Sequence, residues 1–136
     1  FDTDILSDLA REVPSIQARV AAIPAAEQFV PIVAAEEALR GQLATIRRAQ
    51  TGAGSVSTEV AYAYLQETLE QMRGMQLLAY TQTADMLFRT WRAAKIRIGT
   101  QDLRIAAIAF AHNAKLVTRN ARDYALVPGL NLDVWN

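Results

Sequence analysis

The sequence predicts a single α/β domain over residues 1–136, with a mainly parallel central sheet of four to five short strands flanked by helices. Three observations predict this fold. A chain of 136 residues fits one domain. Its 51% of hydrophobic residues can form a buried core without disulfide or metal support. Segments with helical periodicity alternate with short apolar runs of strand length, which is typical of a parallel sheet covered by helices.

Prolines divide the first third of the chain. Residues 4–9 begin a short helix that ends before Pro14, and a second helix follows and ends at Pro24. The apolar run at residues 28–33 predicts a strand, with Pro31 at an edge or near the end of that strand.

Two long helices and a strand are predicted in the middle of the chain. Apolar positions recur at helical spacing over residues 34–50 and again over residues 58–73. The segment 51–55 contains two glycines and separates these helices. Gly74 is a suitable C-cap for the second helix, and the apolar residues 75–80 follow as a strand.

The last third continues the alternation. Thr83 caps a helix that runs to about residue 94, and Thr100 caps a helix over residues 101–112 that is rich in Ala and Ile. Residues 115–118 read as a buried strand, and residues 132–135 as the strand that closes the sheet.

The absence of certain residues and segments limits the function classes. The chain has no cysteine, which excludes disulfides, zinc–thiolate sites and cysteine nucleophiles. No segment approaches the roughly 20 apolar residues of a membrane span, and no signal peptide is recognisable, so we expect a cytoplasmic protein with no membrane partner. The chain opens at Phe1, and we expect a few residues of a first strand to precede it.

The net charge is zero but unevenly distributed. Residues 1–88 hold 6 basic and 11 acidic side chains, whereas residues 89–136 hold 8 basic and 3 acidic ones. This asymmetry suits a site that binds cations and also faces a polyanion, although ordinary solvated surface would give the same totals.

The acidic residues fall at equivalent places in the predicted topology, at a strand exit or in the first turn of a helix. They are Asp2, Asp4, Glu36, Glu37, Asp102 and Asp123. Such positions meet at one edge of a parallel sheet, where carboxylates repel each other unless a hard cation lies between them. Mg²⁺ and Mn²⁺ prefer oxygen ligands and can activate water for attack on phosphorus. Each acid taken singly also makes a good helix cap, so this placement alone leaves both interpretations open.

Four segments resemble the signature segments of the PIN-domain nucleases, in the same order and at similar spacing along essentially the whole chain. They are Phe1-Asp2-Thr3-Asp4-Ile5-Leu6-Ser7, Glu37-Ala38-Leu39-Arg40-Gly41, the stretch from Ile98 to Ala109 around Asp102, and Leu116-Val117-Thr118-Arg119-Asn120-Ala121-Arg122-Asp123-Tyr124. Within that family the sequence is similar to the VapC-type toxins of bacterial type II toxin–antitoxin pairs. The resemblance therefore implies a PIN-like domain.

The resemblance also implies an activity and a set of site residues. The activity is hydrolysis of RNA phosphodiester bonds by an endoribonuclease that uses metal-activated water, with Mg²⁺ as the cofactor and Mn²⁺ as a substitute. The implied metal-binding and catalytic acids are Asp2, Glu37, Asp102 and Asp123, and the supporting residues are Asp4, Thr118 and Asn120. Glu37 is preferred to Glu36 for its spacing to Gly41. Many relatives have Asp where Asn120 stands, which leaves open whether Asn120 or Asp123 is the fourth group of the site.

Binding partners follow from the same resemblance. It implies an RNA substrate, a cognate antitoxin and a homodimer, and Arg104, Arg119 and Arg122 could steer RNA phosphates, or could be solvated surface charges. We expect the antitoxin groove near Leu6, Leu9 and Ile16 and along the helix at residues 58–73.

Two other function classes fit parts of the sequence. One is a non-catalytic binding module with the same fold. The other is a haloacid-dehalogenase-type phosphatase, suggested by the Asp-x-Asp of Asp2 and Asp4. That chemistry also needs a positioned lysine and a later pair of acids, but the only lysines are Lys95 and Lys115, and Asp102 and Asp123 stand apart.

Overall fold

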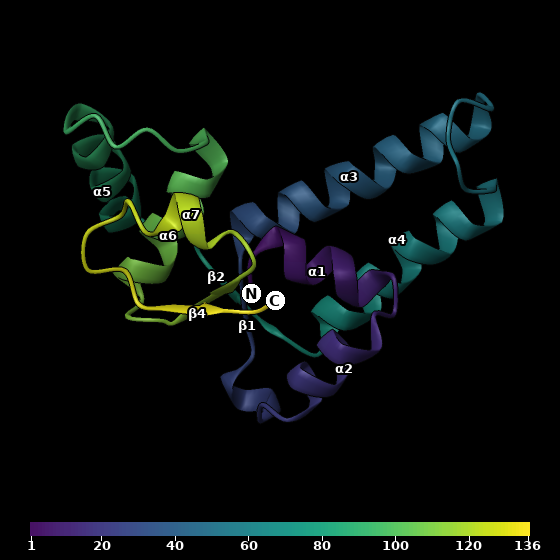
Figure 1. Cartoon of the computed structure of the whole chain (residues 1–136), viewed down its shortest axis with the longest axis horizontal. Helices are drawn as coiled ribbons and strands as arrows, with labels where there is room; N and C mark the ends of the chain where they lie inside the picture. The colour runs from purple at the N-terminus through teal and green to yellow at the C-terminus, as the bar shows by residue number, and fades with distance from the viewer.

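The computed structural model describes all residues from Phe1 to Asn136 as an α/β fold with four short strands (Figure 1). Its elements, in chain order, are α1 (Thr3–Ala10), α2 (Pro14–Ala21), the 3-10 turn η1 (Ala25–Glu27), β1 (Phe29–Pro31), α3 (Ile32–Gln50), α4 (Thr58–Arg73), β2 (Gln76–Leu78), α5 (Gln82–Ala93), α6 (Thr100–Ala111), β3 (Leu116–Thr118), α7 (Ala121–Tyr124) and β4 (Leu132–Val134). The predicted fold class is therefore confirmed at the level of alternating helices and strands.

The strands form two parallel pairs, β1 with β2 and β3 with β4, so one central sheet of four to five strands is not formed. The first two residues of the chain lie between the pairs. The Phe1 ammonium donates to the Phe29 carbonyl oxygen at 2.7 Å, and the Asp2 amide donates to the Val117 carbonyl oxygen at 2.9 Å. These two hydrogen bonds connect the two strand pairs, whose strands have only three residues each.

The α6 helix forms the centre of the hydrophobic core. Leu103, Ile105 and Ile108 have no exposed surface, and the small side chains of Ala106 and Ala107 let neighbouring elements approach closely. Helices α5 and α3 pack against α6, which places its first turn beside the strand ends (Figure 1). Burial of this helix on several sides explains its near-continuous apolar sequence.

Helix boundaries follow the prolines and the capping residues. Pro14 is the first residue of α2, and Gly74 caps α4, as predicted. The predicted cap at Thr83 is wrong, since the hydroxyl of Thr81 accepts from the Ala84 amide at 3.2 Å and α5 starts earlier. The predicted strand at residues 28–33 is also too long, because α3 begins directly after Pro31.

The three side chains of the first two helices near which the antitoxin groove is expected do not themselves form an exposed surface. Leu6, Leu9 and Ile16 are only 3%, 2% and 2% exposed and belong to the main core, because α1 packs against both α3 and α4. On the helix α4 itself, Tyr62 and Leu69 remain exposed. None of the helices is both long and apolar enough to cross a membrane.

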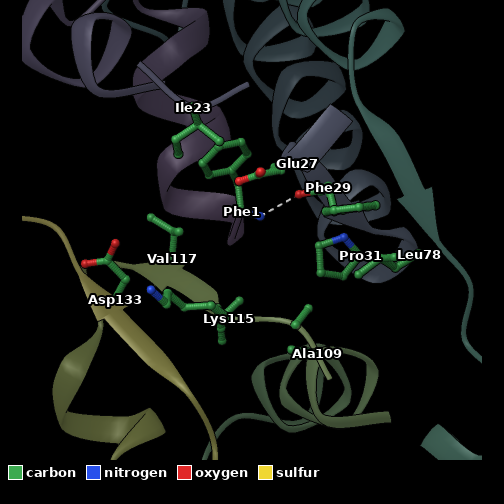
Figure 2. Close-up of a pocket in the computed structure, with 12 residues that line it drawn as sticks. Phe1, Ile23, Glu27, Phe29, Pro31, Leu78, Ala109, Lys115, Val117 and Asp133 are labelled. Carbon is green, nitrogen blue, oxygen red and sulfur yellow. Dashed lines mark hydrogen bonds between the residues drawn. The ribbon is translucent and has the colours of Figure 1, made fainter. Parts of the chain in front are cut away.

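A cavity of about 340 Å³ lies beside Phe1, whose bond to Phe29 is drawn in Figure 2. Its wall is mainly apolar, and its charged side chains are Glu27, Lys115 and Asp133. None of the acids predicted for the functional site lines this cavity. The predicted acidic site is therefore separate from this cavity.

Candidate metal centre

Asp2 lies at the junction between the strand pairs and α1. It is the N-cap of α1, and its Oδ1 accepts from the Thr3 amide at 2.8 Å. A carboxylate is favoured here, because the first amides of a helix lack partners and carry partial positive charge. With 5% of its surface exposed, Asp2 is a buried acid whose orientation is set by the start of the helix.

The end of β3 meets the same helix start. The Thr118 hydroxyl lies 2.7 Å from Asp2 Oδ2 and 3.4 Å from Asp4 Oδ2, so the single proton favours Asp2. The Arg119 amide donates to Asp4 Oδ2 at 2.9 Å. The other oxygen of Asp4, Oδ1, is buried and has no hydrogen-bond partner. This edge of the fold therefore presents two adjacent carboxylates, one with an unused oxygen.

The two neighbouring glutamates of α3 face different surroundings. Glu37 Oε1 accepts from the Thr3 hydroxyl at 3.0 Å, which brings Glu37 to the start of α1. Glu36 forms an ion pair with Arg40 and accepts from Gln101 Nε2 at 2.8 Å. Glu37 is thus the glutamate that lies with Asp2 and Asp4, in agreement with the predicted choice.

Asp102 comes from the first turn of α6. The segment before this helix is held by Arg92, whose Nη1 donates to the carbonyl oxygens of Ile96 and Ile98 at 3.0 and 3.1 Å. Gly99 leaves room for the carboxylate, because a Cβ on this residue would lie 3.3 Å from Asp102 Oδ2. The position of Asp102 therefore depends on a fixed loop and on the absence of a side chain at residue 99.

Tyr124, the last residue of α7, contacts these acids. It has no exposed surface, and its hydroxyl donates to Asp2 Oδ1 at 3.2 Å. The charge of Asp102 also reaches this hydroxyl and contributes to raising the pKa of Tyr124. We call Asp2, Asp4, Glu37 and Asp102 the acid cluster. The structure thus brings three of the four predicted catalytic acids into one place.

The acids of the cluster repel one another, and no positively charged side chain forms an ion pair with them. Burial, followed by the charge of Asp4, raises the pKa of Asp2 to about 6, although the Thr118 hydroxyl lowers it. Burial and the charge of Asp2 raise the pKa of Glu37. Burial and the charges of Glu37 and Asp123 raise the pKa of Asp102. None of the four acids takes part in an ion pair.

Asp123 differs from the acids of the cluster. Its side chain is partly exposed and accepts from Asn120 Nδ2 and Arg122 Nε, both at 3.2 Å. These two contacts lower the pKa of Asp123. Its charge reaches Asp102, so Asp123 lies at the rim of the cluster. The Asn120 side chain caps α7 by accepting from the Asp123 amide at 3.4 Å.

The three arginines predicted to meet RNA have other contacts in the structure. Arg119 pairs with Asp8 at 2.7 Å, and Arg122 pairs with Asp123. Arg104 has no ion pair, lies 4.7 Å above the ring of Phe88 and donates to Gln101 Oε1 at 2.9 Å. Of the three, Arg104 is the arginine that is both held in place and free of a carboxylate partner.

The donor set of the acid cluster fits a hard divalent cation. No group of three or more acids or histidines stands at spacing ready for a metal ion. Mg²⁺, however, often takes one or two protein carboxylates and completes its shell with water and substrate phosphate. The buried free oxygen of Asp4 and the unpaired charges of Asp2, Glu37 and Asp102 supply oxygen ligands of this kind.

Two residues that hydrogen-bond to the acid cluster, Tyr124 and Thr3, were not predicted from the sequence. Tyr124 follows Asp123 in the fourth motif, and Thr3 stands between Asp2 and Asp4 in the first, so their positions in the motifs could have indicated them. The contact of Tyr124 with Asp2 could not be predicted, because the two residues are 122 positions apart in the chain.

Comparison with known proteins gives a uniform result. No protein-family model matches the chain, and no curated protein matches it in sequence. Its structure is similar to VapBC2 from Rickettsia felis bound to a promoter DNA fragment, with 21% identity, a TM-score of 0.76, and 99% of this chain and 96% of that chain covered. It is similar to DNA-bound VapBC from Salmonella typhimurium, with 19% identity, a TM-score of 0.77, and 99% and 96% covered.

A third similar structure is VapBC-1 from nontypeable Haemophilus influenzae. It shares 21% identity and a TM-score of 0.74, and the match covers 98% of this chain and 95% of that chain. In each case nearly the whole of both chains is aligned, so the likeness concerns the complete fold. The chain therefore has the VapC PIN-domain fold found in VapBC toxin–antitoxin complexes, as its four motifs predicted.

Proposed function

We propose that this protein is a Mg²⁺-dependent endoribonuclease and the toxin component of a toxin–antitoxin pair, with Mn²⁺ able to replace Mg²⁺. One observation carries the proposal. Asp2 and Asp102 come from the starts of α1 and α6, and Glu37 comes from the second turn of α3. These three acids raise one another's pKa values and have no cationic partner. Uncompensated buried carboxylates destabilise a fold, so their presence in one place favours a site that binds a cation.

The chain's own residues divide the work as follows. Asp2, Glu37 and Asp102 would hold the ion, while the Thr3 amide and the Thr118 hydroxyl orient the Asp2 carboxylate. When bound, a divalent cation supplies Lewis-acid chemistry that favours attack of water on phosphorus and stabilises the negative charge formed there.

Two further groups serve the water and the substrate. Asp4 Oδ1, buried and without a partner, would accept a hydrogen bond from water near the ion. Arg104 would bind an RNA phosphate, because its guanidinium is held by Phe88 and Gln101 and has no carboxylate to release first. Asp123 would act at the rim through its charge on Asp102.

The partner classes rest on the fold. The similar structures are toxin–antitoxin complexes, two of them with DNA bound, which supports a cognate antitoxin as the partner of this chain. The proposal includes a homodimer and a cytoplasmic location, where RNA is available. The exposed Tyr62 and Leu69 of α4 are accessible to an antitoxin, unlike the buried residues of α1 and α2.

The decisive experiment measures RNA cleavage with Mg²⁺ and with chelator, for the wild-type protein and Asp102→Asn. We expect Mg²⁺-dependent cutting by the wild type and a loss of at least about 100-fold in the variant, because Asp102 would contact the ion directly. Asp85→Asn is the matched control, since Asp85 lies outside the cluster and pairs with Arg89.

The other outcomes distinguish the remaining function classes. A folded wild-type protein that cuts no RNA at any Mg²⁺ concentration would contradict the nuclease and favour a binding module. Release of phosphate from a phosphomonoester, with intact RNA, would favour a phosphatase. Equal cutting by Asp102→Asn and the wild type would remove Asp102 from the site.

A further inference from the structure

Tyr124 holds a position that packing alone does not require. Its ring fills the core between α6 and α7, a space that phenylalanine would fill equally well. Its hydroxyl, however, donates to Asp2 Oδ1 at 3.2 Å. A buried phenol normally has a hydrogen-bond partner, and here that partner is an acid of the cluster.

We propose that Tyr124 is a positioning residue whose hydroxyl orients the Asp2 carboxylate and thereby sets the affinity of the acid cluster for a divalent cation. The inference deepens the proposed function and rests on it. It assigns a role to a residue that does not itself contact the ion.

Three donors hold the Asp2 carboxylate. Its Oδ2 accepts from Thr118, and its Oδ1 accepts from the Thr3 amide and from Tyr124. These donors come from β3, α1 and α7 respectively, so three elements fix one carboxylate. Of these elements, α7 packs against α6, the helix that contributes Asp102.

The attachment of α7 fixes the position of the phenol. The Asn120 amide donates to the Thr118 hydroxyl oxygen at 3.0 Å, and the Asn120 side chain caps the short helix. The Tyr124 ring is fully buried below that cap. The phenol therefore has a fixed position relative to Thr118, so the two hydroxyls together hold the Asp2 carboxylate in one orientation.

The test compares Tyr124→Phe with the wild type. The variant keeps the ring and removes only the hydroxyl, so it should fold with an unchanged circular dichroism spectrum. Mn²⁺ binding is measured from the paramagnetic resonance signal of free Mn²⁺, with no RNA present. We expect an affinity loss of about 10-fold, the lower end of the range known for groups that orient metal ligands.

A matched control is available in Tyr80. Its hydroxyl donates to Asp85 Oδ1 at 2.8 Å, so Tyr80→Phe removes the same kind of bond outside the acid cluster. We expect this variant to bind Mn²⁺ like the wild type. A second readout is RNA cleavage as a function of Mg²⁺: Tyr124→Phe should need about 10-fold more Mg²⁺ and then reach the wild-type rate.

The outcomes separate the inference from the function on which it rests. A wild-type protein that binds no Mn²⁺ would contradict the proposed function itself. Wild-type binding with an equal affinity in folded Tyr124→Phe would overturn the positioning role alone. A loss of cleavage that saturating Mg²⁺ does not restore would also overturn it, because the defect would then lie outside metal binding.

Discussion

Eight of the 14 acidic side chains of this protein form two groups that differ in how their charge is balanced. In the acid cluster of Asp2, Asp4, Glu37 and Asp102, no acid pairs with an arginine. In the second group each acid pairs with an arginine: Asp8 with Arg119, Glu36 with Arg40, Asp85 with Arg89, and Asp123 with Arg122.

The difference shows in the pKa values. Burial and like charges raise the pKa of Asp2, Glu37 and Asp102. Hydrogen bonds and arginines lower the pKa of Asp85 and Asp123. What distinguishes the candidate site is that burial and like charges raise the pKa of its acids and no arginine lies beside them to offset this effect.

Replacing the most buried acid tests this contrast with the largest expected effect. In the metal-free protein, Asp2 has a pKa of about 6 against 3.8 in the unfolded chain. The stability from this raised pKa is fully present below about pH 4 and is lost as the pH rises through about 6. At pH 7 the ionised Asp2 then destabilises the fold by about 3 kcal/mol.

We therefore expect Asp2→Asn to be more stable than the wild type at pH 7 when chelator is present, and the gain to disappear near pH 4. Urea unfolding of both proteins across this range measures the difference. If Asp2→Asn gained less stability over the wild type at pH 7 than at pH 4, this result would refute the unpaired charge of Asp2.

Removing a neutral donor tests the other half of the contrast. Thr118→Val keeps the shape of a side chain with no exposed surface but takes the 2.7 Å hydrogen bond away from Asp2. We expect a loss of about 1–3 kcal/mol at neutral pH, because a buried carboxylate loses its shortest donor. Since the Thr118 hydroxyl lowers the pKa of Asp2, the loss should shrink at acid pH, where Asp2 is protonated. A loss independent of pH would mean that Thr118 serves packing alone.

The smallest effect is expected at the rim. Asp123 accepts from Asn120 and Arg122 and is partly exposed. We predict that Asp123→Asn weakens Mn²⁺ binding less than Asp102→Asn does, because Asp123 acts on the cluster only through its charge on Asp102. Calorimetric titration of both variants makes the comparison. An equal or greater loss for Asp123→Asn would place its carboxylate on the ion.

Local signals explain why much of the fold was predictable. Helical periodicity identified the long helices α3 and α4. Pro14 and Pro24 indicated the limits of α2, and Gly74 indicated the end of α4. The start of α5 was misplaced because two nearby threonines, Thr81 and Thr83, can each cap a helix. Which hydroxyl reaches a free amide is decided by the tertiary path of the chain, and the sequence alone does not contain that path.

Long-range contacts explain what was not predictable. Glu37 was chosen over Glu36 by motif spacing, and its contact with Thr3 places it in the cluster. Leu6 and Leu9 looked suitable for a partner surface, yet α3 and α4 cover them, since an apolar helix face fits a core as well as a groove. The division into two strand pairs depends on single bonds from Phe1 and Asp2, which no periodicity records.

The central claim is that Asp2, Glu37 and Asp102 share one divalent cation. The most direct measurement is anomalous diffraction from crystals of the wild-type protein grown with Mn²⁺. The account predicts an anomalous peak within coordination distance of the Asp2 and Asp102 carboxylates. Well-ordered crystals in which these carboxylates carry no ion, while Mn²⁺ is bound elsewhere on the molecule, would contradict it.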